Sequence, residues 1–257
     1  MKKTLIPIAL IAIPLLALGC PDRVETPDIP FGPTGEEALP FDELERQYTL
    51  DDAARAALTQ ENIELFGQEQ IDQIYARLKA GPIPNGPYRG SFFFAEGAKF
   101  GDVEDLSEGL RGRIVDAKLD RLATIGKMLW RGKVFYKRDR ELRNIIDKEV
   151  VVSGLFGVPL DQMRREEVFG EEVALLFPAK LYKGESLFDP RRPSVIIDYA
   201  DSADIDGYID AIDSLASKNG LQIRDEIRLI RPGFYLGRAY LGSIFGLNFT
   251  LYNAEVE

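Results

Sequence analysis

Apolar and polar residues alternate along short runs in the second half of the chain, which predicts β-strands. The clearest run is IRDEIRLI at residues 223–230, where one face is mostly apolar and the other carries Arg224, Glu226 and Arg228. Arg231-Pro232-Gly233 then predicts a tight turn into the next strand. Eight such strands suit a small closed barrel, which has no exposed edges. The predicted strands are Tyr88–Ala95, Leu129–Tyr136, Ile145–Val152, Val173–Lys183, Ser194–Ala200, Ile223–Ile230, Phe234–Leu241 and Leu247–Ala254.

Helical spacing of apolar residues marks the remaining elements. Residues 41–79 predict one short and one longer amphipathic helix, with Thr59 as an N-cap. Two helices are predicted as insertions in the barrel, at Leu110–Ile125 and Ile205–Leu215, and a shorter helical piece at Leu160–Val168. The pattern therefore predicts an α+β chain, in which an antiparallel barrel of about eight strands carries helical insertions and an N-terminal helical segment.

The first twenty residues have the order of a secretory signal. Met1-Lys2-Lys3 is followed by an apolar run to Leu18, which is shorter than the roughly 20 residues of a membrane-spanning helix. Gly19 directly before Cys20 resembles the lipobox of bacterial lipoproteins, with Ala17 where that family usually has Leu. The resemblance implies that Cys20 is acylated and anchors the protein in the bacterial cell envelope, facing the periplasm or the exterior. The alternative is a plain signal peptide or signal anchor with an incidental cysteine.

Breaks in composition divide the chain into four parts. Residues 1–19 form the predicted lipoprotein signal peptide, and residues 20–40, with five prolines, form a semi-extended tether. Residues 41–80 form the helical segment and residues 81–257 the barrel domain. The sequence GPIPNGP at residues 81–87 separates these last two parts, because glycine and proline interrupt regular structure.

Composition excludes several kinds of site. The chain has no His and one Cys, so it cannot form a Ser-His-Asp triad, a His-ligated zinc or haem site, or an intrachain disulfide. The net charge of −10 argues against nucleic acid as a partner. We therefore expect a protein that is not an enzyme and has no cofactor. The alternative is a carboxylate-dependent enzyme using Asp198 with Asp225.

Four stretches taken in order resemble a loosely defined group of bacterial proteins with calycin-like, lipocalin-like barrels, the GXWXG proteins. The resemblance covers about residues 81–257, and Tyr88 stands where that group has Trp. It implies a calycin-like barrel, and a ligand pocket within it. The four stretches are Gly86-Pro87-Tyr88-Arg89-Gly90, Trp130-Arg131-Gly132-Lys133-Val134-Phe135 with Arg143-Asn144, Tyr182-Lys183-Gly184 with Ile196-Ile197-Asp198-Tyr199, and Pro232-Gly233-Phe234-Tyr235-Leu236-Gly237.

Polar residues inside the predicted strands suggest a ligand site. Strict alternation puts Trp130 on one face of its strand and Lys133 on the other. If Lys133 points inward it needs a counter-charge, for which Asp198 and Asp225 are the candidates. Such a cavity would bind an apolar or amphipathic small molecule or lipid. The predicted ligand-binding residues are Tyr88, Trp130, Lys133, Asn144, Asp198, Tyr199, Asp225 and Tyr235.

Two alternatives stay open beside this interpretation. The barrel can be solid, with a structural ion pair and an interaction role in which the N-terminal helices dock an envelope partner. Residues 202–213 also fit an EF-hand calcium loop in part, with Gly207 at its turn, although Ser202 and Asp213 depart from the usual first and last ligands. The same residues fit a capped amphipathic helix equally well. The candidate calcium ligands are Asp204, Asp206, Asp210 and Asp213.

Overall fold

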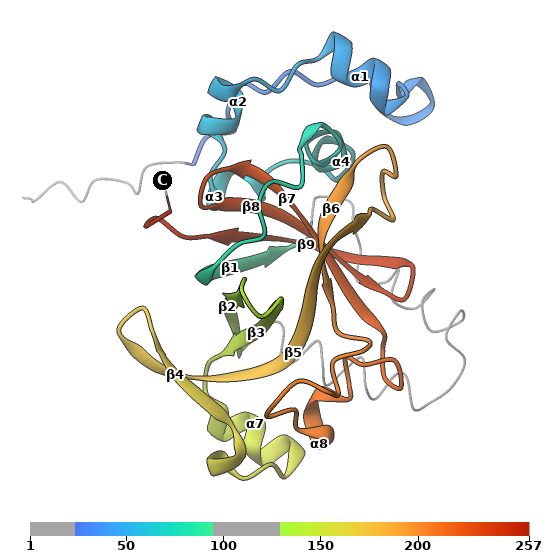
Figure 1. Ribbon diagram of the computed structural model, residues 1–257. Coiled ribbons are helices and arrows are strands. Elements are labelled where there is room, and N and C mark those ends of the chain that lie inside the picture. Colours follow the sequence, from blue (N-terminus) through green and yellow to red (C-terminus); the bar gives the residue numbers. More distant parts are fainter. Residues whose placement is uncertain (1–23, 95–128, 257) are drawn as a thin grey trace, which may run out of the picture.

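The computed structural model describes residues 24–94 and 129–256. In these residues nine strands form one antiparallel sheet in the order β3-β2-β1-β9-β8-β7-β6-β5-β4. An additional pairing of β3 with β5 closes eight of the strands into a barrel, while β4 extends from β5 outside the ring (Figure 1). The closed antiparallel barrel of about eight strands predicted from the alternation is confirmed, and it is consistent with a calycin-like fold.

The strand boundaries agree with the alternation at most positions. Residues 231–234 form the predicted tight hairpin between β7 and β8, where Arg231 pairs with Phe234. Gly233 has a φ of 72° in this turn, a conformation that favours glycine. The strands are β1 (Gly86–Phe93), β2 (Trp130–Tyr136), β3 (Glu141–Ile146), β4 (Arg164–Val168), β5 (Glu171–Glu185), β6 (Pro193–Asp198), β7 (Ile223–Arg231), β8 (Phe234–Leu241) and β9 (Ile244–Tyr252).

Two predicted elements have the wrong type. The run 145–152 is not one strand, because β3 ends at Ile146 and helix α7 (Glu149–Phe156) begins after Lys148, which has a φ of 53°. A short apolar run does not distinguish a strand from a helix by periodicity alone. The piece 160–168 is helical only as a 3₁₀ turn at Leu160–Gln162, after which β4 pairs with β5.

The insertion between β6 and β7 is less helical than predicted. Only α8 (Asp210–Asp213) is helical, and turns make up most of the rest. The side chain of Asp213 holds part of the insertion in place, since its two oxygens accept the backbone N–H groups of Ile209 and Phe177 at 2.7 Å each. The bond with Phe177 ties the insertion to β5. The insertion predicted at 110–125 lies outside the described residues.

The N-terminal segment contains four short α-helices in place of the predicted two. They are α1 (Phe41–Gln47), α2 (Asp52–Ala57), α3 (Gln60–Ile63) and α4 (Gln68–Arg77). Thr59 caps α3 as predicted, and its side chain accepts the backbone N–H of Asn62 at 3.2 Å. No helix in the part of the chain that the structure describes is long and apolar enough to cross a bilayer.

The barrel wall separates two apolar cores. Inward residues such as Tyr235 and Phe249 fill the barrel, and their outward neighbours Phe234 and Leu236 contact the helical segment. Ile71 and Ile74 of α4 are completely buried in this second core. The helical segment and the barrel are therefore packed against each other along one face of the sheet.

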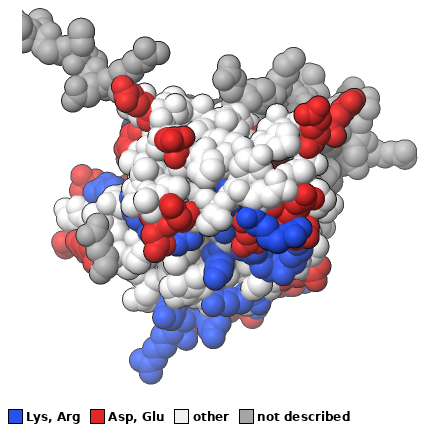
Figure 2. Space-filling view, turned by 90° about the horizontal axis from the view of Figure 1, so that it is seen from above, with Lys and Arg blue, Asp and Glu red and all other residues white. Residues whose placement is uncertain are grey.

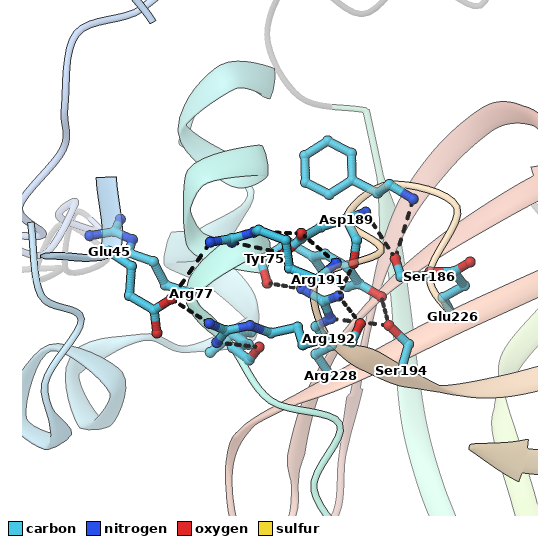
Figure 3. Close-up of polar contacts among 12 residues, drawn as sticks. Glu45, Tyr75, Arg77, Ser186, Asp189, Arg191, Arg192, Ser194, Glu226 and Arg228 are labelled. Carbon is cyan, nitrogen blue, oxygen red and sulfur yellow. Dashed lines mark hydrogen bonds and ion pairs between the residues drawn. The ribbon is translucent and has the colours of Figure 1, made fainter. Parts of the chain in front are cut away.

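A buried arginine joins the helical segment to this face (Figure 3). Arg228 of β7 is fully buried and donates to the carbonyl oxygen of Tyr75 at 3.1 Å. It also donates to Ser194 Oγ at 3.0 Å and to the Asp189 carboxylate at 3.2 Å. Glu45 of α1 pairs with Arg192 in the same network. These bonds connect α1, α4, β6, β7 and the loop after β5, so the helices have a fixed place on the barrel.

Candidate functional site

A polar cluster lies inside the barrel, centred on Lys133 of β2. The Lys133 side chain is almost completely buried, and its Nζ donates three hydrogen bonds. The acceptors are Asn144 Oδ1 at 2.9 Å, Tyr199 Oη at 2.6 Å and Asp225 Oδ2 at 2.9 Å. The ammonium has three protons, so each has a partner. The structure thus brings together four residues that were predicted separately from β2, β3, the end of β6 and β7.

Aromatic rings surround the ammonium. The Lys133 Nζ lies 5.3–5.4 Å from the ring centres of Trp130, Tyr199 and Phe249, within the range of a cation–π interaction. Trp130 Nε1 also donates to Asn144 Oδ1 at 2.9 Å. Phe249 was missed in the sequence analysis, although the alternation of β9 places it on the same face as Leu247 and Leu251.

A bulge in β2 allows Trp130 and Lys133 to share the barrel interior. The pairing of β2 with β3 shifts between Trp130 and Gly132, which corrects the prediction that the two side chains lie on opposite faces. Gly132 has a φ of 142°, and a Cβ atom there would lie 2.0 Å from the carbonyl oxygen of Tyr88. Only glycine fits this position, so the bulge depends on it.

Burial shifts the proton equilibria of the cluster. Desolvation lowers the pKa of Lys133, and the Asp225 carboxylate acts in the opposite direction by stabilising the ammonium. Burial also raises the pKa of Tyr199 well above its ordinary value, and Asp225 adds to this increase. The distance of 2.9 Å between Lys133 Nζ and Asp225 Oδ2 is that of an ion pair, and the raised pKa keeps Tyr199 uncharged at neutral pH.

Three other predicted ligand residues lie elsewhere. Tyr88 and Tyr235 point into the barrel but pack edge to face against each other, with ring centres 5.8 Å apart, and neither bonds to Lys133. Tyr235 Oη donates to the carbonyl oxygen of Pro82 at 3.0 Å. Asp198 points outward, which corrects its prediction as a counter-charge of Lys133. Its oxygens accept Tyr182 Oη at 3.0 Å and the backbone N–H of Ala200 at 2.9 Å.

The position of Asp198 also removes the predicted carboxylate pair. In the β6–β7 register Asp198 lies opposite Arg224, so Asp225 lies on the other face of the wall. Asp225 is inside the barrel with Lys133, and Asp198 is outside with Tyr182. The two carboxylates do not face each other and cannot share one substrate.

The candidate calcium ligands do not converge. In the described part of the chain, no three His, Cys, Asp or Glu residues are grouped so that they could hold a metal ion. Asp204 pairs with Lys180 at 2.8 Å, and both oxygens of Asp213 are occupied by backbone N–H groups. Asp206 contributes its backbone oxygen to Arg143. The calcium-loop hypothesis for Asp204, Asp206, Asp210 and Asp213 is therefore not supported.

Comparison with known proteins adds little to this geometry. No family model matches the chain, and no curated protein sequence matches it. A crystal structure of a protein from Thermomonospora curvata is similar at 15% sequence identity, covering 74% of this chain and 88% of that one, with a TM-score of 0.38. Residues 1–23, which include Cys20 and the whole predicted signal peptide, lie outside the described part, so the lipid anchor stays a prediction.

Proposed function

We propose that this protein is a lipid-anchored protein of the bacterial cell envelope that binds a small amphipathic molecule inside its barrel. The anchor part of the proposal depends on the order of charged, apolar and small residues up to Cys20. The binding part depends on the Lys133 cluster. Lys133, Asn144, Tyr199 and Asp225 supply hydrogen-bond donors and acceptors in an otherwise apolar interior.

The observation that carries the proposal is an ion pair in a place where the fold does not need one. The interior of a small barrel can be filled with apolar side chains alone. A buried ion pair is often no more stable than apolar residues of similar size. Lys133 and Asp225 are buried inside the barrel although apolar side chains could be at least as stable there. Their polar groups are therefore available for a ligand.

The cluster also indicates the type of ligand. Asp225 already balances the charge of Lys133, so a charged head group would leave the interior with an uncompensated charge. We therefore expect an uncharged polar head, such as a hydroxyl, an amide or an ester carbonyl. Beside the cluster, the inward side chains of Phe92, Trp130 and Leu247 are only partly buried and offer an apolar wall for the rest of the ligand.

The single tryptophan of the chain gives a direct test. Trp130 donates to Asn144 within the cluster, so its fluorescence should change when a ligand enters. We expect a monoacylglycerol to bind more tightly than the fatty acid of the same chain length. Tyr199→Phe and Lys133→Met should each weaken binding about tenfold, the size of one lost hydrogen bond.

Asp198→Asn is the matched control, because Asp198 lies on the outer face of the same wall. It should leave the affinity unchanged. The proposal is overturned if neither lipid changes the Trp130 fluorescence or produces heat in calorimetry. It is also overturned if Tyr199→Phe, which removes only one hydroxyl, binds the monoacylglycerol as the unchanged protein does.

One observation favours a second candidate, a solid barrel that serves as an interaction module. Lys133 has a partner for every proton within the protein, as expected of a purely structural cluster. The apolar face of the helical segment is not free for docking, because Ile63, Ile71 and Ile74 are fully buried against the barrel. A partner of the helices would contact their exposed outer face. Absence of any lipid binding together with a full pull-down of an envelope protein would favour this candidate.

A further inference from the structure

A second feature lies at the surface of the barrel, and none of the residues that line it belongs to the Lys133 cluster. A depression of about 950 Å³ is bordered by the chain before β1, the turn between β2 and β3, and the end of β5. Its polar lining consists of Asn85, Lys137, Arg138, Arg140, Tyr182 and Lys183. We infer that this depression, which we call the basic hollow, binds an anionic phosphate group.

Charge is the first argument. The lining contains four cationic side chains and no Asp or Glu, in a chain with a net charge of −10. Lys137, Arg138, Arg140 and Lys183 are all exposed. On the face of the molecule shown in Figure 2, Lys and Arg also gather mainly toward one edge. Four like charges around one concavity repel one another, and a bound anion relieves that repulsion.

The second argument is the lack of internal partners. Among the described residues, the side chains of these four cations form no ion pair or hydrogen bond. By contrast, Arg131, Lys180 and Lys218, which are also largely exposed, each pair with a carboxylate. Asp139 belongs to the same turn but does not line the hollow. The cations of the basic hollow are therefore available to an external anion.

The third argument is that hydrogen bonds hold together the three segments that carry these side chains. The backbone N–H of Lys137 donates to Asn85 Oδ1 at 3.2 Å, which ties the turn to the chain before β1. The N–H of Leu181 donates to the Arg140 carbonyl oxygen at 2.7 Å, which ties the other side of the turn to β5. Tyr182 is fixed by its hydrogen bond to Asp198. The three segments that carry the cations are thus joined around the hollow.

The chemistry favours phosphate over other anions. Each guanidinium presents paired N–H donors that match two oxygens of a phosphate, and Lys supplies a point charge. The volume lies at the upper end of ordinary ligand pockets, so it accommodates a pyrophosphate or a phosphate ester with its attached group. The source can be a soluble phosphorylated compound or the head group of an anionic phospholipid.

Binding of pyrophosphate to the full chain, measured by calorimetry at low ionic strength, tests the inference. The variant Arg138→Gln/Lys183→Gln should weaken binding at least about tenfold, since two charge-assisted hydrogen bonds are lost. Arg46→Gln/Lys218→Gln removes the same charge from other exposed positions and should change the affinity less than about twofold. Sedimentation with phosphatidylglycerol vesicles, against phosphatidylcholine vesicles, tells a lipid head group from a soluble phosphate.

Sedimentation with the neutral phosphatidylcholine vesicles measures any membrane binding by the apolar N-terminal run, which does not depend on the charge of the lipid. Pyrophosphate binding that depends on the basic hollow supports the inference whichever vesicle result accompanies it. Two results overturn it: no binding of either pyrophosphate or phosphatidylglycerol vesicles, or an equal loss in the two double variants. Neither result bears on lipid binding inside the barrel, because the Trp130 titration reports a different site.

Discussion

At the scale of single residues, the Lys133–Asp225 pair is the least expected feature of the barrel, because it is an ion pair buried in an apolar interior. Lys133 and Asp225 are 3% and 5% exposed, and water can screen neither charge. The pair is neutralised within the cluster, where Tyr199 and Asn144 take the remaining hydrogen bonds of the ammonium. Removing one partner leaves the other buried and charged, which destabilises the protein more than replacing both partners with apolar residues.

Asp225→Asn tests this interpretation through stability. We expect the substitution to lower the free energy of unfolding by about 3–5 kcal/mol, because Lys133 then lacks a buried counter-charge. Urea unfolding followed by the fluorescence of Trp130 measures the change. Asp198→Asn keeps its acceptor oxygen on the outer face and should alter stability by no more than about 0.5 kcal/mol. Equal effects of the two substitutions would show that Asp225 is not the counter-charge.

At the scale of elements, the insertion between β6 and β7 shows how one side chain can set local structure. Asp213 is 2% exposed, and its carboxylate holds the N–H groups of Ile209 in the insertion and Phe177 in β5. Phe177 has a φ of 50°, so β5 is irregular where it receives this contact. The insertion is therefore shaped by its attachment to the barrel more than by its own helical periodicity.

The same carboxylate gives a prediction about pH. Burial raises the pKa of Asp213 to about 6 against an ordinary value near 3.8, and its backbone hydrogen bonds and Arg143 only partly offset this. A raised folded pKa means that the folded state binds the proton more tightly, so this contribution to stability is complete below about pH 4 and is lost by about pH 6. Relative to Asp213→Asn, the unchanged protein should lose roughly 1–3 kcal/mol over that range.

Chemical denaturation of both proteins at several pH values measures this difference. The comparison is made as a difference because other carboxylates also titrate there. A difference that stays constant from pH 4 to pH 6 would mean that Asp213 titrates in the folded state as it does in the unfolded one.

At the scale of the whole molecule, the two faces of one sheet serve two cores. Residues of β7 and β8 alternate between the barrel interior and the surface under the helical segment. Two buried arginines lie on the sheet face that the helices cover. Arg228 donates to the backbone of Tyr75, and Arg238 pairs with Asp72 of α4. The barrel and the helices therefore depend on each other through both apolar and ionic contacts.

Deletion of residues 41–79 should consequently fail to leave a soluble barrel. It would expose Ile230, Phe234 and Leu236, and it would remove buried partners of Arg228 and Arg238. We expect aggregation or the loss of a cooperative unfolding transition, measured by size-exclusion chromatography and circular dichroism. A monomeric shortened chain with an unchanged transition would show that the barrel is stable without the helices.

The sequence alone determined the barrel, since alternation is a local property that a pleated strand imposes on its own residues. It also indicated that Lys133 needs a counter-charge, because a buried ammonium needs a partner in any fold. Which carboxylate supplies it was decided by tertiary structure. The bulge at Gly132 turns Trp130 and Lys133 to the same side, and the β6–β7 register places Asp225 inside and Asp198 outside.

The basic hollow and the second core also came from tertiary structure alone. Asn85, Arg140 and Lys183 are far apart in the sequence, and no periodicity connects them. The apolar stripe of residues 63–78 predicted helices, but it did not indicate that the outer wall of the barrel covers them. Periodicity shows which face of an element is apolar, whereas the partner of that face depends on which distant parts of the chain pack against each other.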